Sequence, residues 1–127
     1  EAGIPEDMPL VSSVIYNRLD KGMALQMDSV VSYILQEDKV NLTYADIAVE
    51  SDYNPYKNTG LPPGPICSPG INAIKAAISP AKTDYLYFVV SEKLDGSAAF
   101  SSDYNQFLKD KDAYYKAYRK AESEKEN

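Results

Sequence analysis

The stretch LPPGPICSPG, from Leu61 to Gly70, places four prolines and two glycines within ten residues. Proline fixes φ and removes a backbone donor, while glycine reaches conformations that other residues avoid. We therefore expect a rigid, non-repetitive surface loop rather than a flexible linker. A tyrosine-rich segment precedes this loop and an apolar segment follows it. A rigid loop between them should hold these two segments in fixed positions.

Composition narrows the classes of function. The 127 residues are 44% hydrophobic, which suits one domain with a real core, and no apolar run approaches the length of a membrane span, so the chain as given is expected to be soluble. The net charge of −6 disfavours nucleic acid or anionic lipid as a partner. The chain has no histidine, which excludes histidine triads and histidine-containing metal sites. Its one cysteine, Cys67, which we expect to be packed, cannot form a thiolate cluster.

Helical spacing predicts two helices in the first third of the chain. Apolar residues recur at helical spacing over about 8–21, with Asp7 as the N-cap, Gly22 as the stop and Arg18 away from the apolar stripe. A short extended piece, 23–27, should follow. Asp28 or Ser29 can then cap a second helix.

The middle of the chain predicts two further helical segments. Thr43 should cap a single turn within 41–47. After the proline-rich loop, Ser68 should cap a helix that Pro69 starts and Pro80 ends. Its isoleucines, spaced i, i+3 and i+7, are Ile71, Ile74 and Ile78.

The last third predicts a hairpin and a helix. The run 85–90 is typical of a strand buried on both faces, and Asp95 with Gly96 can turn the chain into a second strand at 98–101. A terminal helix should follow from about Tyr104, with a frayed polar tail at 122–127. We therefore expect one α+β domain, 1–127, with several helices packed around a small antiparallel hairpin.

Four blocks of the sequence together resemble the catalytic domain of the YceG-like family of endolytic murein transglycosylases. They are VSSVIYNRLDKGMALQMDSVVSY from Val11, the segment Tyr53 to Tyr56, the proline-rich loop, and SPAKTDYLYFVV from Ser79. The resemblance runs from Glu1 to about Asn105. It implies a lysozyme-like catalytic domain whose membrane anchor, small domain and catalytic helix lie upstream, on the outer side of the cell membrane.

The resemblance also implies a reaction without metal or cofactor. Counting back without a gap from the Asn17–Leu19 motif places the family's general-acid glutamate at Glu1, although a chain that starts there should be weak or inactive alone. Glu6 and Asp7 are alternatives that look like first-turn acids of a helix. The implied reaction cleaves the β-1,4 bond between N-acetylmuramic acid and N-acetylglucosamine of peptidoglycan and leaves a 1,6-anhydro end.

Candidate glycan-binding residues lie in two of the matching blocks. Aromatic faces stack on sugars and amides bond to acetamido groups, although loop tyrosines often only cover a core, and Asp28 has capping as its rival role. Pro63 and Gly64 would contribute backbone groups. Lys82 and Thr83 either contact glycan or, as we favour, tether a loop. The proposed binding set is Gln26, Asp28, Tyr53, Asn54, Tyr56, Pro63 and Gly64.

Three other functions remain open from the sequence. A non-catalytic glycan-binding module would keep the loop but not the acid, a lysozyme-like hydrolase would use Glu1 and Asp28, and a scaffold would bind wall-synthesis machinery without turnover. The resemblance implies peptidoglycan synthases as partners. Where the family commonly has a histidine before the hairpin phenylalanine, this chain has Ala98 and Ala99 before Phe100.

Overall fold

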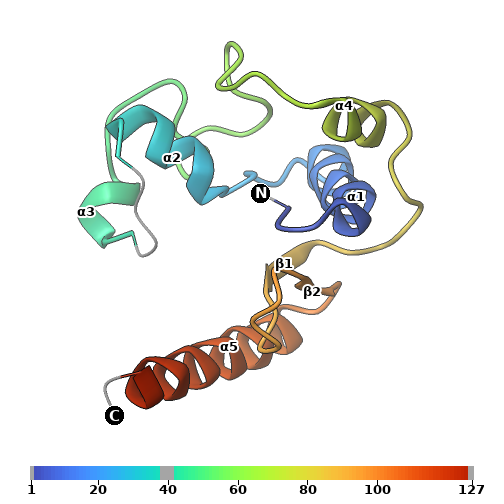
Figure 1. The fold of residues 1–127 in the computed structure, drawn as a ribbon. Coiled ribbons are helices and arrows are strands. Elements are labelled where there is room, and N and C mark those ends of the chain that lie inside the picture. The colour runs from blue at the N-terminus through green and yellow to red at the C-terminus, as the bar shows by residue number, and fades with distance from the viewer. Residues whose placement is uncertain (1, 38–41, 126–127) are drawn as a thin grey trace. The chain divides into compact units, whose positions relative to one another are not determined.

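The structure is a computed structural model, and it describes residues 2–37 and 42–125. The chain forms two compact units: residues up to Asn17 together with those from Gly70 onward, and the intervening Arg18–Pro69. Five α-helices and a two-stranded antiparallel sheet in the described residues confirm the α+β class (Figure 1). The elements are η1 (Pro5–Asp7), α1 (Met8–Asp20), α2 (Asp28–Leu35), α3 (Tyr44–Ile47), α4 (Ile71–Ile78), β1 (Tyr87–Val90), β2 (Ala98–Ser101) and α5 (Tyr104–Lys125).

Helix α1 lies beside α4 and supplies most of the first unit's core (Figure 1). Val11 and Val14 on α1 are buried, as is Ala76 on α4, and the Tyr16 hydroxyl donates to the Ala77 carbonyl at 2.6 Å. The predicted cap Asp7 belongs to η1 instead, and its buried carboxylate accepts from the Ala98 N–H at 2.8 Å. The predicted boundaries of α1 are confirmed. Asp7, however, does not cap this helix but holds the backbone of β2.

Helix α4 begins and packs differently from the prediction. It starts at Ile71 with Gly70 as N-cap, and no side chain caps it, so the predicted start at Ser68 and Pro69 is two residues too early. Ile71 and Ile78 are 64% and 76% exposed, whereas the small Ala76 is the residue that faces the core. An apolar stripe usually marks the buried side of a helix, but here the buried position of the helix is an alanine.

The hairpin is stabilised from one side by α5. β1 pairs with β2 in antiparallel register, Phe88 opposite Phe100, and the Tyr87 ring lies 5.5 Å from those of Tyr104 and Phe107. An isolated two-stranded hairpin is marginal in water, so this aromatic contact is needed. The prediction that the strand is buried on both faces is wrong, because Val90 is 47% exposed.

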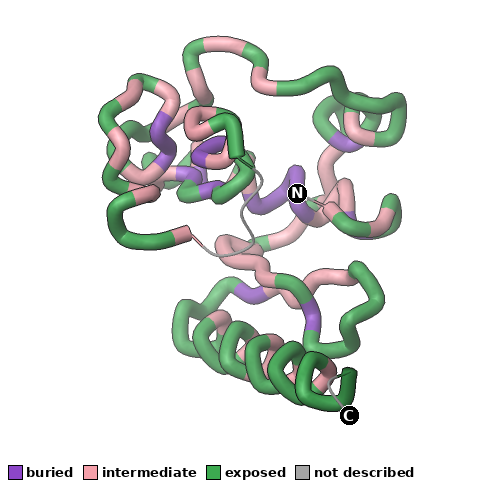
Figure 2. Tube along the Cα trace, turned by 60° about the vertical axis from the view of Figure 1, so that its left-hand side comes forward, coloured by how far each residue is buried: buried purple, intermediate pink, exposed green. Residues whose placement is uncertain are grey.

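Helix α5 is a mostly exposed element. None of its residues is buried, and Figure 2 shows it in green and pink along its whole length. It continues to Lys125, so residues 122–125 of the polar tail, expected to fray, are helical. Residues 126–127 lie outside the described part of the chain.

The hairpin turn is closed by hydrogen bonds to one carboxylate. The Ser97 hydroxyl and N–H both donate to Asp95, which holds the pKa of that carboxyl below its ordinary value. Because a lowered pKa favours the folded state only while the group is ionised, this contribution is lost as the pH falls through the folded-state pKa. Gly96, at φ +87°, makes the turn possible.

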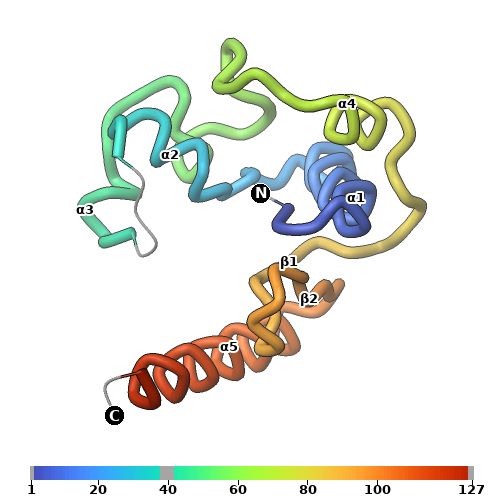
Figure 3. The backbone as a smooth tube through the Cα atoms, in the orientation of Figure 1, coloured from blue at the N-terminus to red at the C-terminus, as the bar shows by residue number. Residues whose placement is uncertain are grey.

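The second unit is built around α2. Its buried apolar residues are Leu25, Met27, Val30 and Val31. The predicted cap at Thr43 is confirmed: its hydroxyl accepts from the Asp46 N–H, and the Asp46 carboxylate accepts from the Thr43 N–H. From α3 the chain continues as a long irregular loop, 48–70, which Figure 3 shows as a tube without regular turns. Cys67 in this loop is exposed, so the expectation of a packed thiol is wrong.

The backbone around Gly3 generates a testable prediction. A Cβ at Gly3 would lie 2.2 Å from the Gly96 carbonyl oxygen, which is backbone and cannot rotate away. Gly3→Ala should therefore lower the free energy of unfolding by about 1–3 kcal/mol, the usual cost of overpacking. Gly70→Ala is the matched control, because nothing lies within 4 Å of its Cβ position. Equal melting temperatures of the two variants would contradict the contact.

Candidate functional site

Asn54 holds the tyrosine-rich loop in place. Its side chain has no exposed surface; its amide nitrogen donates to the carbonyls of Ile47 and Val49 at 2.9 and 2.8 Å, and its carbonyl oxygen accepts from the Tyr56 N–H at 2.9 Å. Both the NH₂ group and the oxygen of the amide are thus used in bonds within the fold. Asn54 therefore fixes the loop, and a glycan cannot reach it in this conformation.

Gln26, Asp28 and Tyr56 form an exposed polar cluster. The Tyr56 hydroxyl donates to the Asp28 carboxylate at 2.5 Å, and the Gln26 N–H donates to the carbonyl of Pro55 at 3.3 Å. Gln26 has φ +51°, a left-handed conformation that a residue with a side chain seldom adopts. Such strained residues cluster at functional sites. The structure brings together three of the predicted binding residues, from two segments of the chain.

Asp28 does not have the capping role that was its alternative. Helix α2 begins at Asp28, its N-cap is Met27, and no side chain caps it. The segment 23–27, predicted as a short extended piece, belongs to no helix or strand, and its last residue, Met27, has an extended backbone. The Asp28 carboxylate is held by Tyr56 at the start of the helix, where a negative charge is favourable.

Tyr53, Pro63 and Gly64 form a second part of the predicted set. The half-buried Tyr53 ring lies 5.7 Å from that of Tyr33, and a Cβ at Gly64 would lie 2.9 Å from the Tyr53 hydroxyl oxygen. Pro63 is exposed. A cavity beside Tyr53 holds only about 10 Å³, too little for a sugar ring, so a glycan would have to lie on this surface.

Arg18 holds the backbone that leads into the polar cluster of Gln26, Asp28 and Tyr56. The sequence analysis placed Arg18 away from the apolar stripe but predicted no role for it. Its side chain is buried, and Nη1 donates to the carbonyls of Ala24 and Leu25 at 2.9 and 3.0 Å. These carbonyls immediately precede Gln26, so the guanidinium fixes the backbone from which Gln26 projects. An arginine four residues before a glycine helix stop was the available signal, since the chain must fold back past it.

Thr83 has the tethering role that we favoured. Its hydroxyl lies 2.7 Å from that of Ser13, and the Asn17 amide donates to the carbonyls of Thr83 and Tyr85 at 3.0 and 2.9 Å. These bonds attach the segment before β1 to α1. Lys82 is exposed beside them, on an open surface.

The predicted acid, Glu1, lies outside the described residues. The segment after it is fixed by the close approach of Gly3 to Gly96 and by the Asp7 bond to Ala98. Asp7 is therefore occupied within the fold, whereas Glu6 is exposed.

The sequence profile of the YceG-like family matches residues 1–113. The chain belongs to the YceG-like family. It is 43% identical over 114 residues, 90% of its length, to an endolytic murein transglycosylase of Bacillus subtilis, and 40% identical over 94 residues, 70% of its length, to one of Streptococcus pneumoniae. It spans 31% and 17% of those two proteins.

A solved structure supports the fold. The crystal structure of a YceG-like protein of Listeria monocytogenes is 47% identical and aligns with a TM-score of 0.73 over 78% of this chain and 32% of its own. Within residues 2–37 and 42–125, no helix is long and apolar enough to cross a membrane. The same residues contain no group of three or more acidic or cysteine side chains placed to hold a metal ion.

The buried amide of Asn54 can be tested directly. Asn54→Ala removes three hydrogen bonds and deprives two partly buried carbonyls and one N–H of this partner, which should cost about 2–4 kcal/mol of unfolding free energy. Asn58→Ala is the control, because this nearby amide also donates to backbone carbonyls but is exposed. Denaturant unfolding should show the larger loss for Asn54; a loss no larger than that of Asn58→Ala would refute its anchoring role.

Proposed function

We propose that this chain is catalytic sequence of an endolytic peptidoglycan transglycosylase. The observation that carries the proposal is the exposed cluster of Gln26, Asp28 and Tyr56, on a loop that Asn54 and Arg18 fix from inside, in a member of the YceG-like family. The names of the curated relatives support the reaction class. Because the chain spans only part of those relatives, its activity and substrate are carried over as part of this proposal.

The proposed chemistry needs one carboxyl group. Glu1 protonates the glycosidic oxygen between N-acetylmuramic acid and N-acetylglucosamine, and the C–O bond to the leaving sugar breaks. Glu1 then accepts the proton of the muramoyl 6-hydroxyl, whose oxygen bonds to the anomeric carbon and closes a 1,6-anhydro ring. The carboxyl is restored to its acid form, and no water is consumed.

The proposed binding residues act on the glycan through stacking and hydrogen bonds. Tyr53 and Tyr56 offer aromatic surface to sugar rings, and the Gln26 amide can both donate to and accept from an acetamido group. Asp28 accepts from sugar hydroxyls and holds the Tyr56 hydroxyl. Pro63 and Gly64 supply a rigid edge of backbone groups.

The proposal extends to location and partners. The family resemblance supports a full-length protein anchored in the cell membrane, acting on its outer side and meeting peptidoglycan synthases. The rivals are a glycan-binding module without turnover and a hydrolase that uses Glu1 with Asp28. The two enzymes differ in their products, because hydrolysis leaves reducing ends and the transglycosylase leaves anhydro ends.

The acid is tested by a neutral isostere. Purified glycan strands are incubated with the full-length protein and with its Glu1→Gln variant, and products are identified by mass spectrometry. We expect anhydro-ended products from the wild type and a loss of at least about 100-fold in the variant, because an amide cannot shuttle the proton. Reducing ends would favour the hydrolase, and equal rates for the variant would remove Glu1 from the mechanism.

Asp28 separates the two enzymatic readings. If it only binds glycan, Asp28→Asn should keep cleavage within about 150-fold of the wild type, since losing one hydrogen bond to a charged group costs about 1.5–3 kcal/mol, which is roughly 10- to 150-fold. If it is the second carboxylate of a hydrolase, cleavage should fall by about 10³-fold or more. Tyr56→Phe is the matched control, because it removes the partner hydroxyl and leaves the carboxylate.

A further inference from the structure

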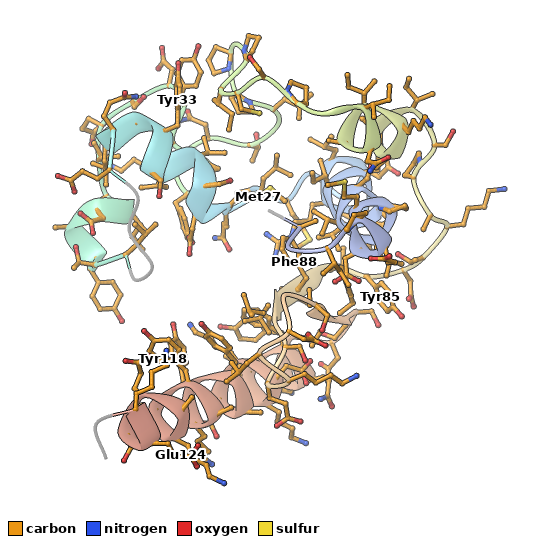
Figure 4. All side chains as sticks on the ribbon, viewed as in Figure 1. Met27, Tyr33, Tyr85, Phe88, Tyr118 and Glu124 are labelled. Atoms are coloured by element: carbon orange, nitrogen blue, oxygen red, sulfur yellow. The ribbon has the colours of Figure 1, made fainter. Side chains whose placement is uncertain are left out.

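Three tyrosines form one aromatic surface on the second half of α5. The ring of Tyr114 lies 5.5 Å from that of Tyr115 and 6.0 Å from that of Tyr118. Tyr115 and Tyr118 are 37% and 38% exposed. In Figure 4 Tyr118 projects from one side of α5 and Glu124 from the other. We call Tyr114, Tyr115 and Tyr118 the tyrosine face.

Hairpin packing does not account for the tyrosine face. The ring contacts between the hairpin and α5 involve Tyr104 and Phe107, and Tyr114 lies about 10 Å further along a helix that rises 1.5 Å per residue. The family profile also ends at residue 113, one residue before the face begins. The three tyrosines therefore lie beyond both the aromatic contact with β1 and the part of the chain that matches the family.

The surroundings of the tyrosine face are basic in an acidic chain. Between Lys109 and Lys120 there are five basic side chains and two acidic ones, whereas the whole chain carries −6. Lys111 and Arg119 are four residues before and after Tyr115, which places them one turn away on the same side of the helix. An ion pair in this stretch joins Lys116 to Asp112 at 2.9 Å and involves neither Lys111 nor Arg119.

We propose that the tyrosine face, with Lys111 and Arg119, binds a peptidoglycan strand through residues that take no part in the proposed cleavage. Tyrosine faces stack on the C–H surfaces of sugar rings, and the two cations pair with the free carboxylates of the stem peptides or, where a peptide is absent, of the lactyl groups. The choice of peptidoglycan rests on the proposed function. The basic side chains around the face complement the carboxylates of such a strand. A bilayer and a second copy of the chain are the occupants that the experiment must exclude.

The surface is tested by co-sedimentation with insoluble peptidoglycan. In the Glu1→Gln background, to prevent cleavage, Tyr115→Ala/Tyr118→Ala should raise the dissociation constant about tenfold, the effect of losing two stacking contacts of 0.5–1 kcal/mol each. Tyr44→Ala is the control, because Tyr44 is 91% exposed on α3 and should leave binding unchanged. Arg119→Gln should also weaken binding, because it removes one of the two cations. Amidation of the peptidoglycan carboxylates should weaken wild-type binding, and Arg119→Gln should then cause no further loss.

Three results would overturn the proposal. The first is unchanged peptidoglycan binding by the double variant. The second is that the double variant loses binding only to vesicles of anionic phospholipid and not to peptidoglycan. The third is a difference in oligomeric state between the wild type and the double variant in sedimentation velocity. Cleavage of short soluble strands separates the two proposals. It is measured with the double substitution in a protein that keeps Glu1, and the proposed surface predicts that this variant cleaves at the wild-type rate. If the protein cleaves glycan and the double variant binds peptidoglycan as well as the wild type, the proposed surface alone is refuted. If binding depends on the tyrosines but the wild type does not cleave, the proposed enzymatic function alone is refuted.

Discussion

The second unit depends on satisfying the backbone of a loop that has no regular structure. From residue 48 to 70 no helix or strand supplies the hydrogen bonds that buried N–H and C=O groups require. The Asn54 amide supplies three of them, to Ile47, Val49 and Tyr56, from a position with no exposed surface. Prolines reduce the number of backbone donors further, so a loop of this length can hold one conformation.

The same principle organises the edge that carries the polar cluster. Arg18 binds the carbonyls of Ala24 and Leu25, and Gln26 then takes a left-handed conformation that its own backbone would avoid. Tyr56, positioned through Asn54, reaches Asp28 at the start of α2. Buried polar side chains therefore hold the exposed ones, and the surface that we propose for glycan binding is rigid because its support is internal.

In the first unit, side chains replace what a larger sheet would supply. Asn17 and Ser13 on α1 bind the segment before β1 through Thr83, and Asp7 binds the backbone of β2. Helix α5 also covers the two-stranded hairpin, where the Tyr87 ring contacts those of Tyr104 and Phe107. On α4 the buried residue is Ala76, and the isoleucines of this helix remain exposed.

The sequence by itself determined the α+β class, most element boundaries, the Thr43 cap and the family, because periodicity, turn residues and motif spacing are local properties. Tertiary structure alone decided which side chains became structural: Asn54 and Arg18 turned inward, Asp7 bonded to β2, Asp28 paired with Tyr56 rather than capping α2, and the isoleucines of α4 stayed exposed. For Asp7 the physical reason is separation along the chain, because its partner, the Ala98 N–H, is 91 residues away. Asn54 and Arg18 bond to backbone within seven residues, but the carbonyls that they reach depend on how the chain folds back there, which a spacing pattern does not specify.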